Sequence, residues 1–266
     1  MTDGIAMRLM AAGAALLLLG TALPSAQAED AEIVAKRAAE RRDFTDAEII
    51  DGFFKIAFGA ELQLQGRVDR IRKYDGPVRV YIDSRARPDR SAQVAAVVDE
   101  IRAHVANLDI TMTKDAATAN VLVTLVRDRD LDRTVQKLYG RARARRIQQS
   151  LEPQCLSGFR KDESFRIQRS EVILVVDVGD FVFYDCVYEE LLQSLGPIND
   201  DTSVPWTMFN DDVQLGFFDI YDQYLMNILY DPRIRPGMTR EEARAVLPEV
   251  MVTVREFVAR TNGLAR

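Results

Sequence analysis

The sequence predicts an α+β protein with a mixed, mainly parallel sheet and covering helices. Short runs rich in β-branched residues alternate with segments whose apolar residues recur at helical spacing, and the chain beyond residue 186 has helical spacing only. This order favours helices over at least one face of a sheet. Four strands are expected, at residues 78–83, 110–113, 121–126 and 166–179.

The expected helices follow the same periodicity. They lie at residues 47–59, 91–108, 128–150, 186–196, 217–230 and 240–263. In the last of these, Thr239 and Glu242 are spaced for a capping box, and Gly263 is a stop signal. Pro248 is expected to kink this helix. The run VLVTLV at 121–126 is apolar enough to be a central strand.

The first 28 residues have the pattern of a secretory signal peptide. A lone arginine, Arg8, precedes an apolar run from Leu9 to Leu23, and Ala26-Gln27-Ala28 forms an A-x-A cleavage site. The run is about 15 residues long, shorter than the roughly 20 needed to span a bilayer. We expect cleavage after Ala28 and a periplasmic or secreted protein without stable membrane insertion; an uncleaved anchor is the alternative.

The rest of the chain is expected to form one domain. Residues 29–43 are rich in Ala, Glu and Arg and predict a flexible lead-in, whereas 44–266 contain no linker or repeat. A formal net charge of −6 argues against a nucleic-acid partner. Two cysteines, Cys155 and Cys186, favour a disulfide in an exported chain, with two separate buried thiols as the alternative.

The stretch CVYEELLQSLGPIND, residues 186–200, holds the candidate site. On a helix, Glu189 and Gln193 lie one turn apart on one side, while the leucines gather on another side. The leucines are expected to be buried, and the Glu/Gln side is expected to face a cleft or water. A plain amphipathic helix that stops at Gly196 would also account for these residues.

Over roughly its last two-thirds, the chain resembles the metzincin branch of zinc proteases, whose motif is HExxHxxGxxH. The matching frame keeps Gly196, and the three histidine positions hold Glu189, Gln193 and Asn199. Glu190 stands where the family has its general base. The resemblance implies a zincin-like fold with an active-site-type helix, in which these positions face the former metal site.

Three more segments are similar to that family. Met208 stands where a methionine turn would support the metal site, and residues 217–232 resemble the family's closing helix. The strand RSEVILVVDV, at 169–178, would be the edge strand that aligns an extended peptide. Trp206, beside Met208, would either line the cleft or anchor the loop, and is expected to be largely buried.

A closer resemblance is to an uncharacterised family of exported bacterial proteins, domain of unknown function 2927. It rests on CLSGF, CVYEELLQSLGPIND, SVPWTMFND and LYDPRIRPGMT, which span residues 155–239. This resemblance implies no established activity.

The ligand types argue against zinc chemistry. Amide oxygens such as those of Gln193 and Asn199 are weak zinc ligands, and an oxygen-only set suits Ca²⁺ or Mg²⁺ better. We therefore expect a catalytically inactive domain that binds a peptide or protein segment in its former substrate cleft, without a cofactor. The alternative is a metal-dependent peptidase with atypical oxygen ligands and Glu190 as general base.

Other candidate sites are weaker. Glu190 with Asp200 or Asp211 would form a glycosidase-type carboxylate pair, although adjacent acidic residues are more often solvated turns and caps. The only histidine, His104, is expected on a helix face away from the site. The basic run RARARR, residues 141–146, is expected to be a solvated helix face rather than a ligand site.

Overall fold

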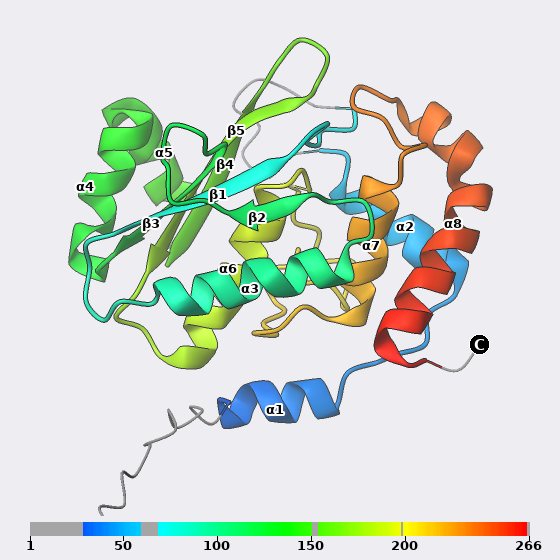
Figure 1. Cartoon of the computed structure of the whole chain (residues 1–266), viewed down its shortest axis with the longest axis horizontal. Helices are drawn as coiled ribbons and strands as arrows, with labels where there is room; N and C mark the ends of the chain where they lie inside the picture. Colours follow the sequence, from blue (N-terminus) through cyan, green and yellow to red (C-terminus); the bar gives the residue numbers. More distant parts are fainter. Residues whose placement is uncertain (1–28, 60–68, 151–153, 198, 265–266) are drawn as a thin grey trace, which may run out of the picture.

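The computed structural model describes residues 29–59, 69–150, 154–197 and 199–264, and it contains a five-stranded sheet of order β2-β1-β3-β5-β4 (Figure 1). The first four strands of that order are parallel to one another, and β4 runs antiparallel to β5. The expected α+β class with a mixed, mostly parallel sheet is confirmed. The strands are β1 (Val78–Ser84), β2 (Ile110–Met112), β3 (Val121–Val126), β4 (Cys155–Lys161) and β5 (Ile167–Val175).

Helices cover both faces of this sheet. On one face, α3 and α6 pack beside a group formed by α2, α7 and α8; on the other face lie α4 and α5 (Figure 1). No helix within the described ranges combines the length and the apolar character that crossing a membrane requires. The helices are α1 (Ala31–Ala38), α2 (Asp46–Ile56), α3 (Ser91–His104), α4 (Asp128–Tyr139), α5 (Arg141–Ser150), α6 (Asp180–Gln193), α7 (Ile220–Tyr230) and α8 (Arg240–Asn262).

Strand β5 packs against the helices on both faces of the sheet. Val172 and Leu174 point into the large core beneath α6, whereas Ile173 and Val175 join a smaller cluster under α4 and α5. Alternate side chains of a strand point to opposite faces, so a continuous apolar run is what a strand covered on both sides requires.

Two strand expectations have different outcomes. The run VLVTLV forms β3, which lies between β1 and β5 and is central as expected. The expectation that RSEVILVVDV is the edge strand is wrong, because β5 lies between β3 and β4. The strand at that edge of the sheet is β4, which is not among the four expected strands, because Ser157 and Gly158 interrupt its apolar pattern.

The C-terminal helices have the predicted end signals. In α8, Thr239 and Glu242 form the expected capping box, and Gly263 ends the helix in the left-handed conformation, with φ of 62°. The helix continues through Pro248.

Residues 29–43, expected as a flexible lead-in, contain α1, whose Ile33 is buried in the large core. The predicted signal peptide, residues 1–28, lies outside the described residues.

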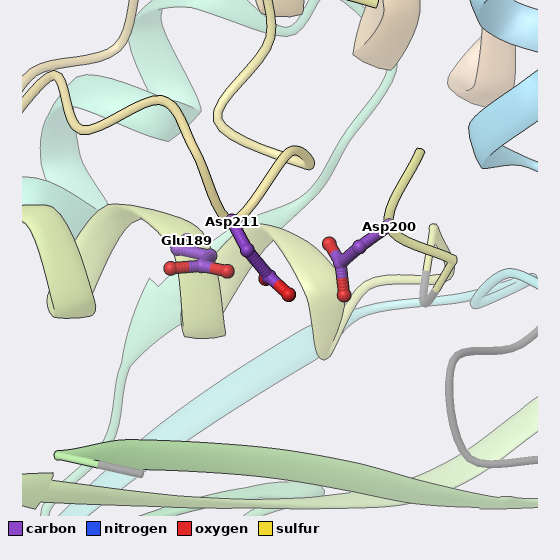
Figure 2. Close-up of side chains that lie close together, drawn as sticks. All are labelled: Glu189, Asp200 and Asp211. Carbon is purple, nitrogen blue, oxygen red and sulfur yellow. The ribbon is translucent and has the colours of Figure 1, made fainter. Parts of the chain in front are cut away.

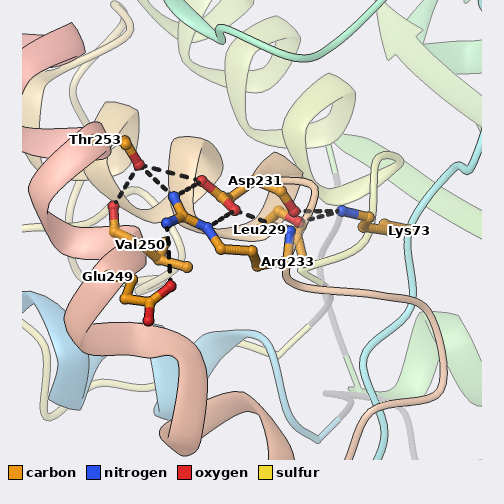
Figure 3. A network of polar contacts seen from close by, with 7 residues as sticks. All are labelled: Lys73, Leu229, Asp231, Arg233, Glu249, Val250 and Thr253. Carbon is orange, nitrogen blue, oxygen red and sulfur yellow. Dashed lines mark hydrogen bonds and ion pairs between the residues drawn. The ribbon is translucent and has the colours of Figure 1, made fainter.

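A polar network fixes the end of α7 (Figure 3). The Lys73 ammonium donates to the carbonyls of Leu229, at 2.8 Å, and Asp231, at 3.2 Å. The Asp231 carboxylate accepts two hydrogen bonds from the Arg233 guanidinium, one from the Arg233 amide and one from Thr253 of α8. These contacts join the segment before β1 to both C-terminal helices, and the lysine satisfies carbonyls that a helix end leaves unbonded.

Candidate functional site

Helix α6 follows β5 directly and is buried on nearly every side. Its polar residues Glu190 and Gln193 are only 6% and 5% exposed, and Asp185 is 9% exposed. Of the two alternatives expected for the Glu/Gln side, a cleft or water, exposure to bulk water does not apply to Gln193. The loop that follows the helix covers this side, because residues 200–213 return over α6.

Three carboxylates meet above α6 and form what we call the acidic cluster: Glu189, Asp200 and Asp211 (Figure 2). One oxygen from each residue lies within 4.8 Å of the others. Glu189 comes from α6, and the other two come from separate parts of the following loop. Three segments therefore converge on one point, and Asp211 is the exposed member.

Gln193 links the acidic cluster to the edge strand. Its amide Nε2 lies 3.1 Å from Asp200 Oδ1 and 3.4 Å from Glu189 Oε1. Its Oε1 accepts a hydrogen bond of 3.3 Å from the Ser157 hydroxyl on β4. With its nitrogen turned toward the carboxylates, Gln193 acts as a donor in this cluster.

Asn199, the third expected metal position, makes a different contact. Its amide nitrogen donates to the Lys55 carbonyl at 2.9 Å, and its side chain packs on Gly59 after α2. A Cβ at Gly59 would lie only 2.7 Å from Asn199 Oδ1. Asn199 thus holds the loop to the end of α2, and its neighbour Asp200 joins the acidic cluster.

Glu190, the expected general base, is buried in α6 and is not one of the three clustered carboxylates. Its charge raises the pKa of Glu189 on one side and that of Tyr139, at the end of α4, on the other. The structure therefore brings Asp200 and Asp211 together with Glu189.

The acidic cluster has unusual electrostatics. Burial is the largest cause that raises the pKa of Glu189 well above its usual value, and repulsion from Glu190 and Asp200 adds to it. Burial likewise raises the pKa of Asp185, one turn earlier on α6, to about 6, although the amides of Leu215 and Gly216 oppose this shift. A bound cation would lower the cost of keeping these carboxylates charged.

The oxygen donors do not fit zinc, which prefers nitrogen and sulfur ligands. They do fit a hard cation: Ca²⁺ bonds to oxygens at about 2.3–2.6 Å, so ligands around one ion lie within about 5 Å of one another. The 4.8 Å spread of the acidic cluster meets that limit.

A disulfide and a hydrogen bond hold the edge strand to α6. Cys155, the first residue of β4, is bonded to Cys186 of α6, as the sequence analysis expected. Along with the contact between Ser157 and Gln193, this bond fixes two points of the strand over the helix. Cys155, Ser157 and Phe159 turn their side chains toward α6, as alternate residues of a strand must.

Met208, the expected methionine-turn residue, is 3% exposed, and its loop is anchored from within. The Asp222 carboxylate of α7 accepts hydrogen bonds from the Met208 amide, at 2.8 Å, and the Thr207 hydroxyl. Asp222 is fully buried beside Asp219, the cap of α7. Asp222 thus holds the loop that carries Asp200 and Asp211.

The expectation that Trp206 is largely buried is wrong, because its side chain is 39% exposed. The indole packs edge-on against Phe44 and carries the Arg41 guanidinium 4.7 Å from its ring centre. These partners come from the segment before α2, so only the inner side of the ring is covered.

The remaining candidates lie away from the cluster. His104, the last residue of α3, rests its Nδ1 against the Glu100 carbonyl at 2.9 Å. The RARARR run forms the first part of α5, on the opposite face of the sheet.

No pattern in the sequence indicates Ser157 as a site residue, and Asp200 and Asp211 were expected only in a carboxylate pair with Glu190. The acidic pairs at 200–201 and 211–212 were visible, but no periodicity fixes how an irregular loop returns to a helix.

Neither the curated proteins nor the solved structures contain a match to this chain. A family model described as "Protein of unknown function (DUF2927)" matches residues 46–249, which include the whole sheet, α6 and the acidic cluster. Since this match covers well over half of the sequence, the chain belongs to the DUF2927 family of proteins of unknown function.

Proposed function

We propose that this chain is an exported, non-catalytic domain that binds an extended peptide along the outer edge of β4, next to the acidic cluster. The observation that carries the proposal is the link from edge strand to cluster: Ser157 of β4 contacts Gln193, and Gln193 contacts Asp200. A peptide paired with this strand would pass beside three carboxylates, which favours a basic side chain in the peptide.

The free edge of β4 supplies the backbone groups. The Gln154 carbonyl accepts from the Val175 amide, so even-numbered residues of β4 bond to β5, and Ser157 and Phe159 direct their backbone groups outward. Within the described ranges, no other strand pairs with this edge. An unpaired edge is the surface to which an extended segment can add.

Export is supported by two features. The disulfide between Cys155 and Cys186 is typical of an oxidising compartment, and the first 28 residues have a signal-peptide pattern. The absence of catalysis is supported by the side chains at the metzincin metal positions, since Gln193 and Asn199 offer amides, and Asn199 is already bonded to the Lys55 carbonyl.

Binding of short labelled peptides with Lys, Arg, Glu or Ala at the centre would test the proposal by fluorescence anisotropy. Ser157→Pro removes one outward N–H group without touching the pairing with β5, and we expect it to weaken binding about tenfold or more. Ser157→Ala, which removes only the contact to Gln193, should retain most of the affinity.

The acidic cluster is tested by a matched pair of variants. Asp211→Asn should weaken binding of Lys and Arg peptides only, whereas Asp212→Asn, an exposed neighbour outside the cluster, should not. The proposal fails if no peptide binds saturably, or if Ser157→Pro binds as tightly as the unchanged chain.

A second candidate function is favoured by the 4.8 Å spread of the acidic cluster: a site for Ca²⁺ or Mg²⁺. Calorimetry with Ca²⁺, Mg²⁺ and Zn²⁺ is the test, and we expect Asp211→Asn to abolish a signal that Asp212→Asn retains. Affinity should rise with pH, because the raised pKa of Glu189 means that a proton must leave before an ion binds. Metal-dependent peptide cleavage that Glu190→Gln abolishes would overturn the non-catalytic assignment.

A further inference from the structure

A polar pocket lies on the face of the sheet opposite α6, and we call it the basic pocket. It has a volume of about 220 Å³ and is lined on β4 and β5 by Gly158, Arg160, Arg169 and Glu171, and from the helices above by Tyr139 and Arg143. Tyr139 ends α4, and Arg143 belongs to the first turn of α5, so the pocket lies under the junction of two helices.

The pocket holds more positive than negative charge. Arg160 and Arg169 are directly opposed partners in the β4–β5 ladder, an arrangement that is unfavourable for like charges. Glu171 offsets only part of it, with its Oε1 at 3.6 Å from Arg160 and 3.9 Å from Arg169. Arg143 adds a third guanidinium, 4.9 Å from the centre of the Tyr139 ring. Three guanidinium groups therefore face one carboxylate in the pocket lining, and the charge of a second carboxylate, Glu190, also acts on Tyr139.

The Tyr139 hydroxyl supplies an unused donor. Its oxygen is buried, and it has no hydrogen-bond partner among the described residues. Burial, followed by the charge of Glu171, raises the pKa of Tyr139, so the hydroxyl keeps its proton. The oxygen lies over Gly158, where a Cβ would be only 3.2 Å away. A side chain at this position would crowd the hydroxyl.

The positive potential of the pocket comes from its side chains, because the negative end of the α4 dipole meets the positive end of the α5 dipole at this junction. Guanidinium groups in a fork geometry and a hydroxyl donor are the groups that commonly bind phosphate oxygens.

We propose that the basic pocket binds a phosphate group, either inorganic phosphate or a small phosphomonoester, through Arg143, Arg160, Arg169 and the Tyr139 hydroxyl. At about 30 Å³ for each water in the liquid, the pocket has room for a tetrahedral oxyanion with a few waters. The ion would relieve the repulsion between the paired arginines and give the hydroxyl its partner. Part of the basic run 141–146 thus has a use beyond solvation.

Calorimetric titration of the full chain with inorganic phosphate, at constant ionic strength, tests the proposal. We expect one saturable site, and about tenfold weaker binding in Arg169→Gln, which removes a charge-assisted hydrogen bond. Tyr139→Phe, which removes the hydroxyl alone, should weaken binding about threefold. Methyl phosphate should also bind, and its affinity relative to phosphate shows whether the fourth oxygen faces bulk water.

Arg145→Gln is the matched control, because it removes the same charge from an exposed position of α5 outside the pocket lining. Its affinity should equal that of the unchanged chain, and circular dichroism should show that all variants are folded. No saturable heat with either phosphate probe, or equal weakening in Arg145→Gln and Arg169→Gln, would overturn the proposal.

Discussion

Gly196 is the glycine at which the candidate site most depends on a special backbone conformation. It ends the turn after α6 with a φ of 144°, and a Cβ there would lie 2.3 Å from the Arg72 carbonyl oxygen. We expect Gly196→Ala to lower the free energy of unfolding by about 2–4 kcal/mol, from backbone strain and overpacking together. Urea denaturation measures the change.

The matched control for that prediction is Gly179→Ala. Gly179 precedes α6 with a φ of −60°, and no atom lies within 4 Å of an added Cβ. Its substitution should change stability by no more than about 0.5 kcal/mol. Equal effects of the two substitutions would contradict the role that we assign to Gly196.

Asp219 and Asp222 lead to a prediction about pH. Both are fully buried, and burial and the neighbouring Asp222 carboxylate raise the pKa of Asp219 well above its usual value. Because this folded-state pKa exceeds the unfolded value of about 4, the stability it contributes is present below pH 4 and is lost as pH rises through the folded-state pKa. Between the unfolded-state and folded-state pKa values, the free energy of unfolding falls by about 1.4 kcal/mol per pH unit.

Asp219→Asn should remove this pH dependence, since an amide resembles the protonated acid at every pH. Relative to the unchanged chain, the variant should gain free energy of unfolding as pH rises from 5 to 9, measured in urea at several pH values. Asp212→Asn, in the exposed part of the loop, is the control. Parallel pH curves for the unchanged chain and Asp219→Asn would show that the pKa of Asp219 is not raised in the folded state.

The sequence predicted some site residues and not others. Cys155 and Cys186 were paired correctly, because two cysteines allow only one disulfide within the chain. Glu189 and Gln193 remain neighbours, because helical spacing brings residues four apart together. Asn199 and Asp200 differ by one position in a loop, where no period decides which side chain turns inward.

Among the contacts between secondary-structure elements, the disulfide between β4 and α6 is the easiest to test by experiment. It closes a loop with a sequence separation of 31 residues, which corresponds to about 3–4 kcal/mol in the chain-entropy account. We expect the double substitution Cys155→Ala with Cys186→Ala to lower the free energy of unfolding by this amount, measured in urea. The same loss should follow reduction of the unchanged chain.

Comparison of those two results is the internal control. A double variant with unchanged stability would mean that β4 is held over α6 by its pairing with β5 and the Ser157–Gln193 contact alone. We expect reduction also to weaken peptide binding, since the disulfide fixes the edge that receives the peptide.

The elements show why β4 was missed and β3 was not. A central parallel strand is buried on both faces, so VLVTLV is apolar throughout and easily recognised. An edge strand needs no such run, and β4 has Ser157 and Gly158 in its middle and two basic residues at its end. The pairing of β4 with β5 depends on tertiary contacts that the local sequence does not reveal. Because of this pairing, RSEVILVVDV lies inside the sheet and not at its edge.

For the whole molecule, the first prediction concerns the N-terminus. If the chain is exported and cleaved after Ala28, its mature form begins at Glu29. N-terminal sequencing and intact-mass measurement of the protein recovered from the periplasm or medium test this. Recovery of the chain with Met1 attached, from the membrane fraction, would support an uncleaved anchor instead.

The fold class could be predicted for the whole molecule, because composition and periodicity determine which segments become strands and helices. The order of the strands could not be predicted, because the local sequence pattern does not determine which strands pair with each other. The acidic cluster depends on that order and on a loop return, and both come from long-range packing.

The position of β3 between β1 and β5 also affects the time course of folding. A chain that crosses a membrane from its N-terminus exposes β1 and β3 first, and β3 then lacks one partner until residues 167–175 arrive. By contrast, β4, β5 and α6 are consecutive, and the only two cysteines join the first of them to the last. Contacts that are close in sequence form early, so we expect oxidation to lock this three-element unit before it docks on β3. The late step of folding would then be the parallel pairing of β5 with β3.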